Sequence, residues 1–326
     1  MMRTAISLII ALSFAIVLPA PANAQEQTVI VVVGAAGTDE YAAQFAEWTD
    51  AWKQACSTSN VTFLTVGLDE RQELSDRARL ERLLGEQAQQ TAAALWLVLI
   101  GHGTFDGRTP KFNLRGPDIS ADDLARWLEP VHCPIAVVNT ASSSAPFLKE
   151  LSAPERVIIT ATKSGFEQNY TRFGQYVAEA IVEPAADLDK DGQTSLLEAF
   201  LTASHRTSEF YAAAGRLATE HALLDDNGDA LGTPADWFRG IRPVQRASDN
   251  ASLDGYRAHQ FHLRYSEAEA RIPAGLRAKR NELELEVMRL RDARAQIPQE
   301  TYFSKLEALL MEIARLYETI EEPNDT

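Results

Sequence analysis

The residue types best suited to chemistry gather first around His102. This histidine stands between Gly101 and Gly103, directly after the apolar run LWLVLI at residues 95–100. An imidazole has an unperturbed pKa near neutrality, so it can accept and donate a proton at physiological pH. The flanking glycines let a substrate backbone approach closely. The segment therefore indicates a proton-transfer residue, with a plain turn histidine as the alternative.

An acidic loop at residues 187–198 forms the second group. Its sequence, DLDKDGQTSLLE, fits the EF-hand calcium loop, in which oxygen ligands surround the ion and a glycine permits the sharp turn. The pattern predicts Ca2+ as the cofactor, bound with the weak affinity of extracellular modules, and an acidic solvated turn is the alternative. The predicted metal ligands are Asp187, Asp189, Asp191, Gln193 through its backbone carbonyl, Ser195 and Glu198.

A weaker echo of this loop follows at residues 225–236. Ala230 replaces the turn glycine, and Pro234 would block a regular exit helix. The favoured interpretation is an Asx-rich turn that ends a helix, and a second cation site stays open. The oxygen-bearing side chains here are those of Asp225, Asn227, Asp229, Thr233 and Asp236.

The elements that must position these residues alternate between strand and helix. Apolar runs bounded by turn residues predict strands, and amphipathic segments between them predict helices. This alternation indicates an α/β fold with a parallel sheet, whose ligand site lies at the carboxyl ends of the strands. The predicted strands are 28–33, 61–66, 95–100, 134–138 and 156–161, and the predicted helices are 39–56, 75–89, 120–130, 172–182 and most of 196–224.

Two strand ends in this pattern resemble the caspase-like cysteine peptidases, the clan of legumains, gingipains and bacterial metacaspase-like proteins. LVLIGHG at 97–103 matches the strand that ends in the catalytic His-Gly, and IAVVNTASSS at 135–144 matches in position the strand that ends in the catalytic cysteine. The resemblance covers residues 28–182. It implies an open, mostly parallel sheet flanked by helices, with His102 as general base and the N–H of Gly103 in the oxyanion hole.

One residue departs from the family pattern. Ala141 stands where the family has its nucleophilic cysteine. An alanine methyl cannot attack a carbonyl, so we expect a pseudoenzyme without cysteine-peptidase turnover. The alternative is a serine that acts with His102, for which Ser142 and Ser143 are the nearest candidates within the run 142–144.

Composition and the first residues indicate an exported protein. Residues 1–24 have the basic start, apolar stretch and Ala-Asn-Ala ending of a signal peptide, so the expected location is periplasmic or secreted. A net charge of −15 argues against nucleic acid and anionic lipid as partners. No later segment predicts a membrane span. Cys56 and Cys133 are expected at the end of the sheet opposite His102, and whether they form a disulfide stays open.

The chain changes character near its C-terminus. Residues 243–254 are rich in Pro, Ser, Asp and Asn and are predicted as a linker. From about residue 266 the sequence is charged and helical, which predicts a helical hairpin that docks on the rest or forms a homodimer. The expected units are 25–250, the α/β domain with the acidic loop, and 251–326, the linker and hairpin. A coiled-coil seam is predicted at Tyr302, Leu306, Leu309, Ile313, Leu316 and Ile320.

These features together predict an exported caspase-like pseudo-peptidase that binds calcium and a protein or peptide partner. Two alternatives from other classes stay open. One is an active hydrolase that pairs His102 with a serine at 142–144. The other is a scaffold that acts through its C-terminal helices. Reaction with a peptide chloromethyl ketone or a fluorophosphonate probe would separate an active enzyme from the other two.

Overall fold

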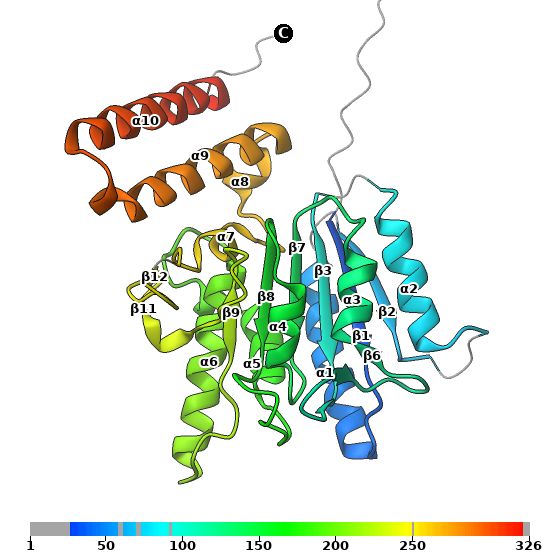
Figure 1. Cartoon of the computed structure of the whole chain (residues 1–326). Coiled ribbons are helices and arrows are strands. Elements are labelled where there is room, and N and C mark those ends of the chain that lie inside the picture. Colours follow the sequence, from blue (N-terminus) through cyan, green and yellow to red (C-terminus); the bar gives the residue numbers. More distant parts are fainter. Residues whose placement is uncertain (1–26, 58–60, 70–72, 91–92, 250, 322–326) are drawn as a thin grey trace, which may run out of the picture.

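A computed structural model describes residues 27–57, 61–69, 73–90, 93–249 and 251–321 (Figure 1). The predicted signal peptide, residues 1–24, lies outside the described residues. The strands are β1 (Gln27–Val33), β2 (Val61–Val66), β3 (Leu95–Ile100), β4 (Gly103–Phe105), β5 (Pro110–Phe112), β6 (Ile119–Ser120), β7 (Ile135–Asn139), β8 (Arg156–Thr160), β9 (Leu223–Asp225), β10 (Thr233–Pro234), β11 (Phe238–Arg239) and β12 (Arg242–Pro243).

The helices follow the same chain order. They are α1 (Asp39–Cys56), α2 (Asp76–Gln87), α3 (Ala121–Leu128), α4 (Ala145–Leu151), α5 (Phe173–Ala180), α6 (Leu196–Ala213), α7 (Tyr256–Gln260), α8 (Glu267–Arg271), α9 (Ala274–Asp292) and α10 (Gln299–Glu321), with short 3-10 turns at Pro184–Ala186, Ala235–Trp237 and Arg294–Gln296. None of the described helices has an apolar stretch long enough to cross a bilayer.

A seven-stranded sheet forms the centre of the molecule, in the order β10-β9-β8-β7-β3-β1-β2. The five strands from β2 to β8 run parallel, and β9 and β10 close one edge in antiparallel pairing. Every residue of β1, β3 and β7 is buried, because both faces of the sheet are covered. The prediction of an α/β fold with a mostly parallel sheet flanked by helices is confirmed.

Helices cover the two faces in two separate clusters of buried side chains. On one face α1, α5 and α6 pack on the sheet with large residues such as Phe45 and Phe200. On the other face α2, α3 and α4 do the same, for example with Leu84 and Phe147. Both faces of the sheet therefore belong to the core, and its strand ends are left to carry polar groups.

The sequence located most helix starts because the capping residues are local signals. Thr38, Ser75 and Ser120 each accept a backbone N–H of the first turn with their side-chain oxygen. Ser120 and Asp123 form a reciprocal capping box. These starts agree with the prediction to within one residue.

Several parts of the chain differ from the prediction, among them the seven-residue helix α4, which was not predicted. The helix expected through most of 196–224 ends at Ala213, next to Gly215 in the left-handed conformation (φ 62°), and the chain returns as β9. The small sheet β4-β5-β6 after β3 was not predicted, because strands of two or three residues have no periodic pattern. Pro234 ends β10 instead of entering a helix, as expected for a residue without a backbone N–H.

The C-terminal hairpin is present, with α9 packed along α10 (Figure 1). It lies at the end of the sheet where the parallel strands begin, since residues of α9 share a 240 Å³ cavity with Gln27 and Ala94. The segment predicted as a linker ends in Asp254, which is 1% exposed. Phe261 and Leu263, beyond the predicted boundary at 250/251, belong to the main core cluster. The predicted division into units stays untested, but the packing is continuous across it.

Truncation tests where the separable part begins. A chain that ends after Asp254 loses two core side chains, Phe261 and Leu263, each worth about 1.5–3 kcal/mol of burial. We expect its melting temperature to fall by roughly 10 °C or more relative to a chain that ends after Ser266. Circular dichroism of the two truncated proteins measures this. Equal melting would place the boundary at Asp254.

Two buried acids next to β9 should make stability depend on pH. The backbone N–H of Asp226 donates to Asp254 Oδ1 (3.0 Å), and Thr233 Oγ1 donates to Asp254 Oδ2 (2.5 Å). Burial and the neighbouring Asp226 carboxyl hold the pKa of Asp254 well above its ordinary value. An unfolded aspartate titrates at about pH 4. Above that pH the folded chain therefore binds more protons than the unfolded chain, and this stabilising contribution is lost as pH rises toward the raised pKa.

The Asp254→Asn variant replaces the titratable carboxyl group with an uncharged amide group of nearly the same shape. Raising the pH from about 5 to about 8 should lower the melting temperature of the wild type more than that of the variant. Differential scanning calorimetry across this range is the measurement. Asp236→Asn, at an exposed position, is the control and should follow the wild type. Parallel curves for wild type and Asp254→Asn would contradict the assignment.

Candidate functional site

His102 follows β3 directly and lies at the carboxyl end of the sheet. Its ring packs against three aromatic rings, those of Tyr41 (5.1 Å between centroids), Phe45 (5.5 Å) and Tyr170 (6.0 Å). Its Nε2 lies 3.2 Å from the carbonyl oxygen of Ala36. A carbonyl can only accept, so this nitrogen carries the proton in that contact. The histidine is thus fixed by α1 and by the loop before it, in a half-buried position.

The glycine after His102 is locked to the end of β7. Its backbone N–H lies 3.3 Å from Ser142 Oγ, and Ser142 Oγ donates to the carbonyl oxygen of Gly103 (3.0 Å). A Cβ on Gly103 would lie 2.2 Å from the carbonyl oxygen of Ser142 and 3.4 Å from the methyl of Ala141. Only glycine fits here. The structure thus brings Gly103, Ala141 and Ser142 together, as the sequence analysis expected.

Ala141 is 1% exposed and has no side-chain group that could react. Its N–H donates to Asn139 Oδ1 (3.1 Å), which fixes the turn immediately after β7. Thr140, between them, bonds through Oγ1 to the carbonyl of Leu99 in β3 (2.8 Å). A buried methyl group therefore occupies the position at which the resemblance predicts a nucleophile.

The three serines after Ala141 are buried and differ in their contacts. Ser142 Oγ is used by Gly103, and Ser144 Oγ lies 3.1 Å from Thr162 Oγ1. Ser143 has a left-handed backbone (φ 54°), and its buried hydroxyl has no partner within the described residues. None of the hydrogen bonds described for these hydroxyls reaches His102.

Neither cysteine can replace the missing nucleophile. Cys56 ends α1 and Cys133 precedes β7, so both lie at the opposite end of the sheet, and both are free thiols. Burial raises the pKa of Cys56 to about 12 and also raises the pKa of Cys133. A thiol with a raised pKa contains little thiolate and is unreactive. The structure therefore contains no Cys56–Cys133 disulfide.

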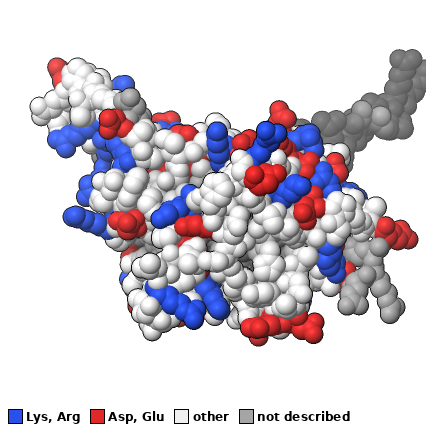
Figure 2. Space-filling model, turned by 60° about the horizontal axis from the view of Figure 1, so that its bottom comes forward, with Lys and Arg blue, Asp and Glu red and all other residues white. Residues whose placement is uncertain are grey.

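An aromatic pair joins the last residue of β4 to the segment that follows β8. Phe166 is 71% exposed, and its ring meets that of Phe105 edge to face at 5.5 Å. Beside it His221 Nδ1 lies 2.6 Å from Glu167 Oε1. Figure 2 shows this end of the molecule, where uncharged residues cover a broad area. The sequence analysis did not identify this pair, because a single Phe in a loop has no pattern.

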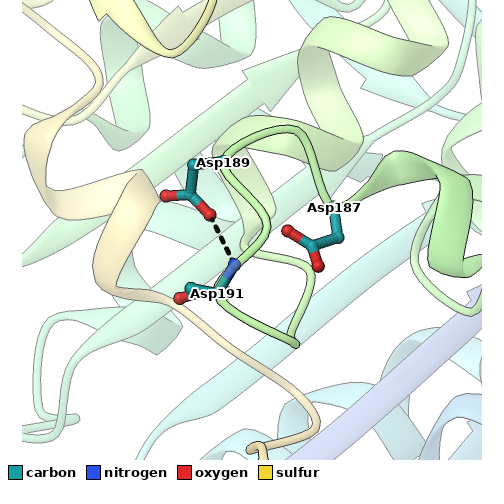
Figure 3. A group of neighbouring side chains, drawn as sticks. All are labelled: Asp187, Asp189 and Asp191. Carbon is teal, nitrogen blue, oxygen red and sulfur yellow. Dashed lines mark hydrogen bonds between the residues drawn. The ribbon is translucent and has the colours of Figure 1, made fainter.

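The acidic loop brings three of its six predicted ligands together. Carboxylate oxygens of Asp187, Asp189 and Asp191 lie within 4.8 Å of one another (Figure 3). Asp187 accepts the backbone N–H groups of Lys190 (2.7 Å) and Gly192 (3.1 Å), and Asp189 accepts that of Asp191 (3.2 Å). Lys190 and Gly192 both have left-handed backbones, with φ of 65° and 88°. These bonds fold the loop around its carboxylates.

Glu198 and Ser195 have other partners. Glu198 is completely buried, and its Oε2 accepts both the N–H and the hydroxyl of Ser195 in a capping box at the start of α6. Its Oε1 accepts the backbone N–H groups of Leu188 (2.7 Å) and Asp189 (3.2 Å). Glu198 therefore supports the loop from the protein side, outside the group of three aspartates.

The loop is also fastened to the segment that leads into the hairpin. Gln193 Oε1 accepts the backbone N–H of Ser266 (3.1 Å), which is the N-cap of α8. His259 Nε2 lies 2.9 Å from Asp189 Oδ2. His259 is not among the predicted metal ligands, and the sequence did not predict its contact with Asp189, because 70 residues separate the two.

The weaker loop repeats the same hydrogen-bond arrangement. Asp225 accepts the N–H groups of Gly228 (3.1 Å) and Ala230 (3.2 Å), and Asn227 accepts that of Asp229 (2.8 Å). Gly228 and Ala230 have left-handed backbones, with φ of 80° and 63°. Ala230 thus adopts the conformation for which a glycine was expected. These are the Asx turns that the favoured interpretation predicted, but the prediction that they end a helix is wrong, because α6 ends twelve residues earlier, at Ala213.

Comparison with known proteins finds no matching family model and no matching curated protein. Among solved structures, the chain is similar to the Drosophila initiator caspase Dronc (13% identity, 62% of this chain and 82% of that chain covered, TM-score 0.41). It is similar to Caspase-1 from Spodoptera frugiperda (10%, 62% and 87%, 0.40). It is also similar to a secreted C11 cysteine protease from Bacteroides thetaiotaomicron, solved with an irreversible peptide inhibitor (11%, 62% and 66%, 0.39).

A cysteine at position 141 should restore a reactive group. In Ala141→Cys the thiol would stand beside Gly103, the residue that follows His102, and an imidazolium that reached it would lower its pKa. We expect iodoacetamide to modify it at neutral pH at least about tenfold faster than Cys133. The double variant Ala141→Cys/His102→Ala should lose this enhancement. Equal rates with and without His102 would mean that the imidazole does not serve position 141. Peptide mapping by mass spectrometry gives both rates.

Proposed function

We propose that this protein is an exported, caspase-like pseudo-peptidase that binds calcium and a protein or peptide partner without cysteine-peptidase turnover. The observation that carries the proposal is the state of the two strand ends. A methyl group, that of Ala141, occupies the nucleophile position, and Ser142 Oγ takes up the N–H of Gly103. The loop after β7 thus provides both differences: Ala141 replaces the expected nucleophile, and Ser142 binds the N–H group expected in the oxyanion hole.

The chemistry that remains is that of recognition. Acyl transfer needs a nucleophile beside its base and a donor left free for the developing oxyanion. His102 supplies a base, but Ala141 cannot attack, and the Gly103 donor is already satisfied inside the protein. A peptide that reached this end of the sheet would be bound and released unchanged.

The surroundings favour a protein or peptide as the bound molecule. Phe166 exposes most of its ring at this end of the sheet, supported from below by Phe105. Exposed aromatic side chains are enriched at the centres of protein interfaces. Figure 2 shows an area without charged side chains at this end of the molecule, so charge does not repel a peptide there.

Calcium is the ion that fits the acidic loop best. Asp187, Asp189 and Asp191 offer hard carboxylate oxygens, and the charge of three carboxylates in close proximity favours a divalent cation. The loop holds its shape through backbone hydrogen bonds to Asp187 and Asp189, which leaves further lone pairs on each carboxylate. Glu198 would add its oxygens only by exchanging bonds it makes now, so we propose a weak site.

One observation favours the active-hydrolase alternative. Ser143 combines a left-handed backbone with a buried hydroxyl that lacks a partner, and strained or unsatisfied groups often mark functional positions. Its hydroxyl is fully buried and has no described bond to His102. The pseudo-peptidase therefore remains the better supported function.

Turnover decides between these two. We expect the wild-type protein to cleave no fluorogenic peptide from a library and to react with neither a peptide chloromethyl ketone nor a fluorophosphonate. Ser143→Ala is then without effect on these readouts. If the fluorophosphonate labels the wild type, and Ser143→Ala or Ser142→Ala abolishes labelling, a serine has taken over catalysis and the pseudo-peptidase proposal is wrong.

Calcium should stabilise the fold through the acidic loop. At about 10 mM calcium and a Kd of roughly 0.1–1 mM, linkage predicts about 1.4–2.7 kcal/mol, or a melting temperature about 3–5 °C higher. Asp191→Asn should lose this shift and keep its stability in chelator, because Asp191 is exposed. Asp50→Asn, at an exposed position of α1 outside both acidic loops, is the control and should keep the shift. Absence of any heat in calorimetry at millimolar calcium would contradict the proposal.

A further inference from the structure

Helix α10 carries two apolar stripes, and only one of them is covered. The predicted coiled-coil seam faces α9, and its residues Tyr302 and Leu316 are 6% and 5% exposed. Beside the seam runs a second stripe of Phe303, Leu310 and Tyr317, spaced by seven residues. These side chains are 50%, 50% and 38% exposed. A seven-residue spacing keeps them on one face of the helix.

Glutamates line the open edge of this second stripe. Glu300, Glu307 and Glu318 lie within one side of the helical wheel, next to the stripe and away from the seam. None of the three takes part in an ion pair within the described part of the chain, whereas Glu312, on the other edge, pairs with Lys279 of α9 (2.9 Å). The stripe is therefore flanked on one side by the apolar seam of the hairpin and on the other by glutamates that form no ion pair within the described part of the chain.

We propose that this stripe and its glutamate edge form a docking surface for a basic amphipathic helix of another protein. Leu310 at its centre and the two aromatic rings at its ends span fourteen residues, about 21 Å of helix. This is the length over which a helix of three or four turns lays its apolar face on a partner. Lys or Arg residues that flank the partner's apolar face would lie along the glutamates.

Charge argues against a second copy of this chain as the occupant. Two α10 helices packed through this stripe would bring their glutamate edges to the same interface, with three carboxylates from each helix and no described basic side chain between them. The chain as a whole carries a net charge of −15, which further opposes self-association through an acidic edge. A basic helix would instead place positive charges beside the glutamates and would be attracted by the negative net charge of the chain.

This surface is independent of the function proposed above. His102 lies at the carboxyl ends of the parallel strands, and the hairpin lies at their amino ends, as α9 shows by lining a cavity with Gln27 and Ala94 (Figure 1). Changes to exposed side chains of α10 therefore leave the strand ends and the acidic loop intact. Failure of one proposal does not affect the other.

The test uses the protein from residue 25 to residue 326. Its binding partner is a synthetic helix of three heptads, about 21 residues, with leucine at the seam positions and lysine at the others. We expect fluorescence anisotropy to show saturable binding that weakens as salt rises to about 0.5 M. Leu310→Ser should weaken binding at least about tenfold. Leu217→Ser is the matched control, since Leu217 is 91% exposed outside the hairpin, and it should leave binding unchanged.

Charge is tested separately. Glu307→Lys should weaken binding of the lysine peptide several-fold and reduce its salt dependence, while Glu47→Lys, an exposed change on α1, should do neither. The same peptide with glutamate in place of lysine should not bind. Equal binding of both peptides, or binding that Leu310→Ser does not weaken, would overturn the proposal.

Two further outcomes would assign the stripe to another occupant and also overturn it. Sedimentation equilibrium could show a dimer that Leu310→Ser dissociates, which would make a second copy the occupant. Phosphatidylcholine vesicles could retain the wild type and not Leu310→Ser, which would make the stripe a lipid-contacting face. We expect a monomer and no retention in these two experiments.

Discussion

The register between β3 and β7 is the constraint on which the candidate site depends. Leu99 pairs with Asn139, and Thr140 fixes that pairing by donating to the carbonyl of Leu99 with both its N–H (3.0 Å) and its hydroxyl (2.8 Å). Both strands are buried on both faces, so a slip would displace core side chains on either side. With this register fixed, His102 and Ala141 emerge from neighbouring strands at the same edge of the sheet. A substitution at that edge therefore changes the side chain but leaves the backbone position, which the strand register sets.

The sequence predicted the sheet because its strands are continuous apolar runs, and it predicted helix starts because caps are local. It could also place Gly103 next to Ala141, since carboxyl ends of adjacent parallel strands meet. It could not predict that Ser142 would bond to Gly103, because that bond depends on packing between distant segments. The capping box of Ser195 and Glu198 is local, but the EF-hand pattern assigned Glu198 to a cation instead. The predicted boundary at 250/251 separated Phe261 and Leu263 from the α/β domain, although both side chains belong to its core.

The acidic residues of this chain serve different physical ends, which composition alone does not separate. Asp254 lies buried beside Asp226 and accepts hydrogen bonds from the backbone of Asp226, which follows β9, and from Thr233 of β10, and burial raises its pKa. Asp191 is exposed and Asp187 partly exposed, and both accept backbone N–H groups of their own loop, so a cation from solvent could reach them. Glu307 on α10 remains unpaired at an apolar edge. The net charge of −15 therefore combines carboxyl groups of three kinds: buried ones in the fold, those of the acidic loop, and those along the exposed stripe of α10.

The hydrogen bonds between Ser142 and Gly103 show how a strand end of this kind can be stable without being catalytic. An enzyme that stabilises an oxyanion must keep a backbone N–H unsatisfied until substrate arrives, and a buried unsatisfied donor costs about 1–3 kcal/mol. Here that donor is satisfied within the protein, and the Gly103 carbonyl receives a bond as well. The methyl group of Ala141 fills the neighbouring space and needs no hydrogen-bond partner. In the proposed pseudo-peptidase, the satisfied donor no longer stabilises an oxyanion, and the edge of the sheet keeps a preformed surface on which a partner could bind.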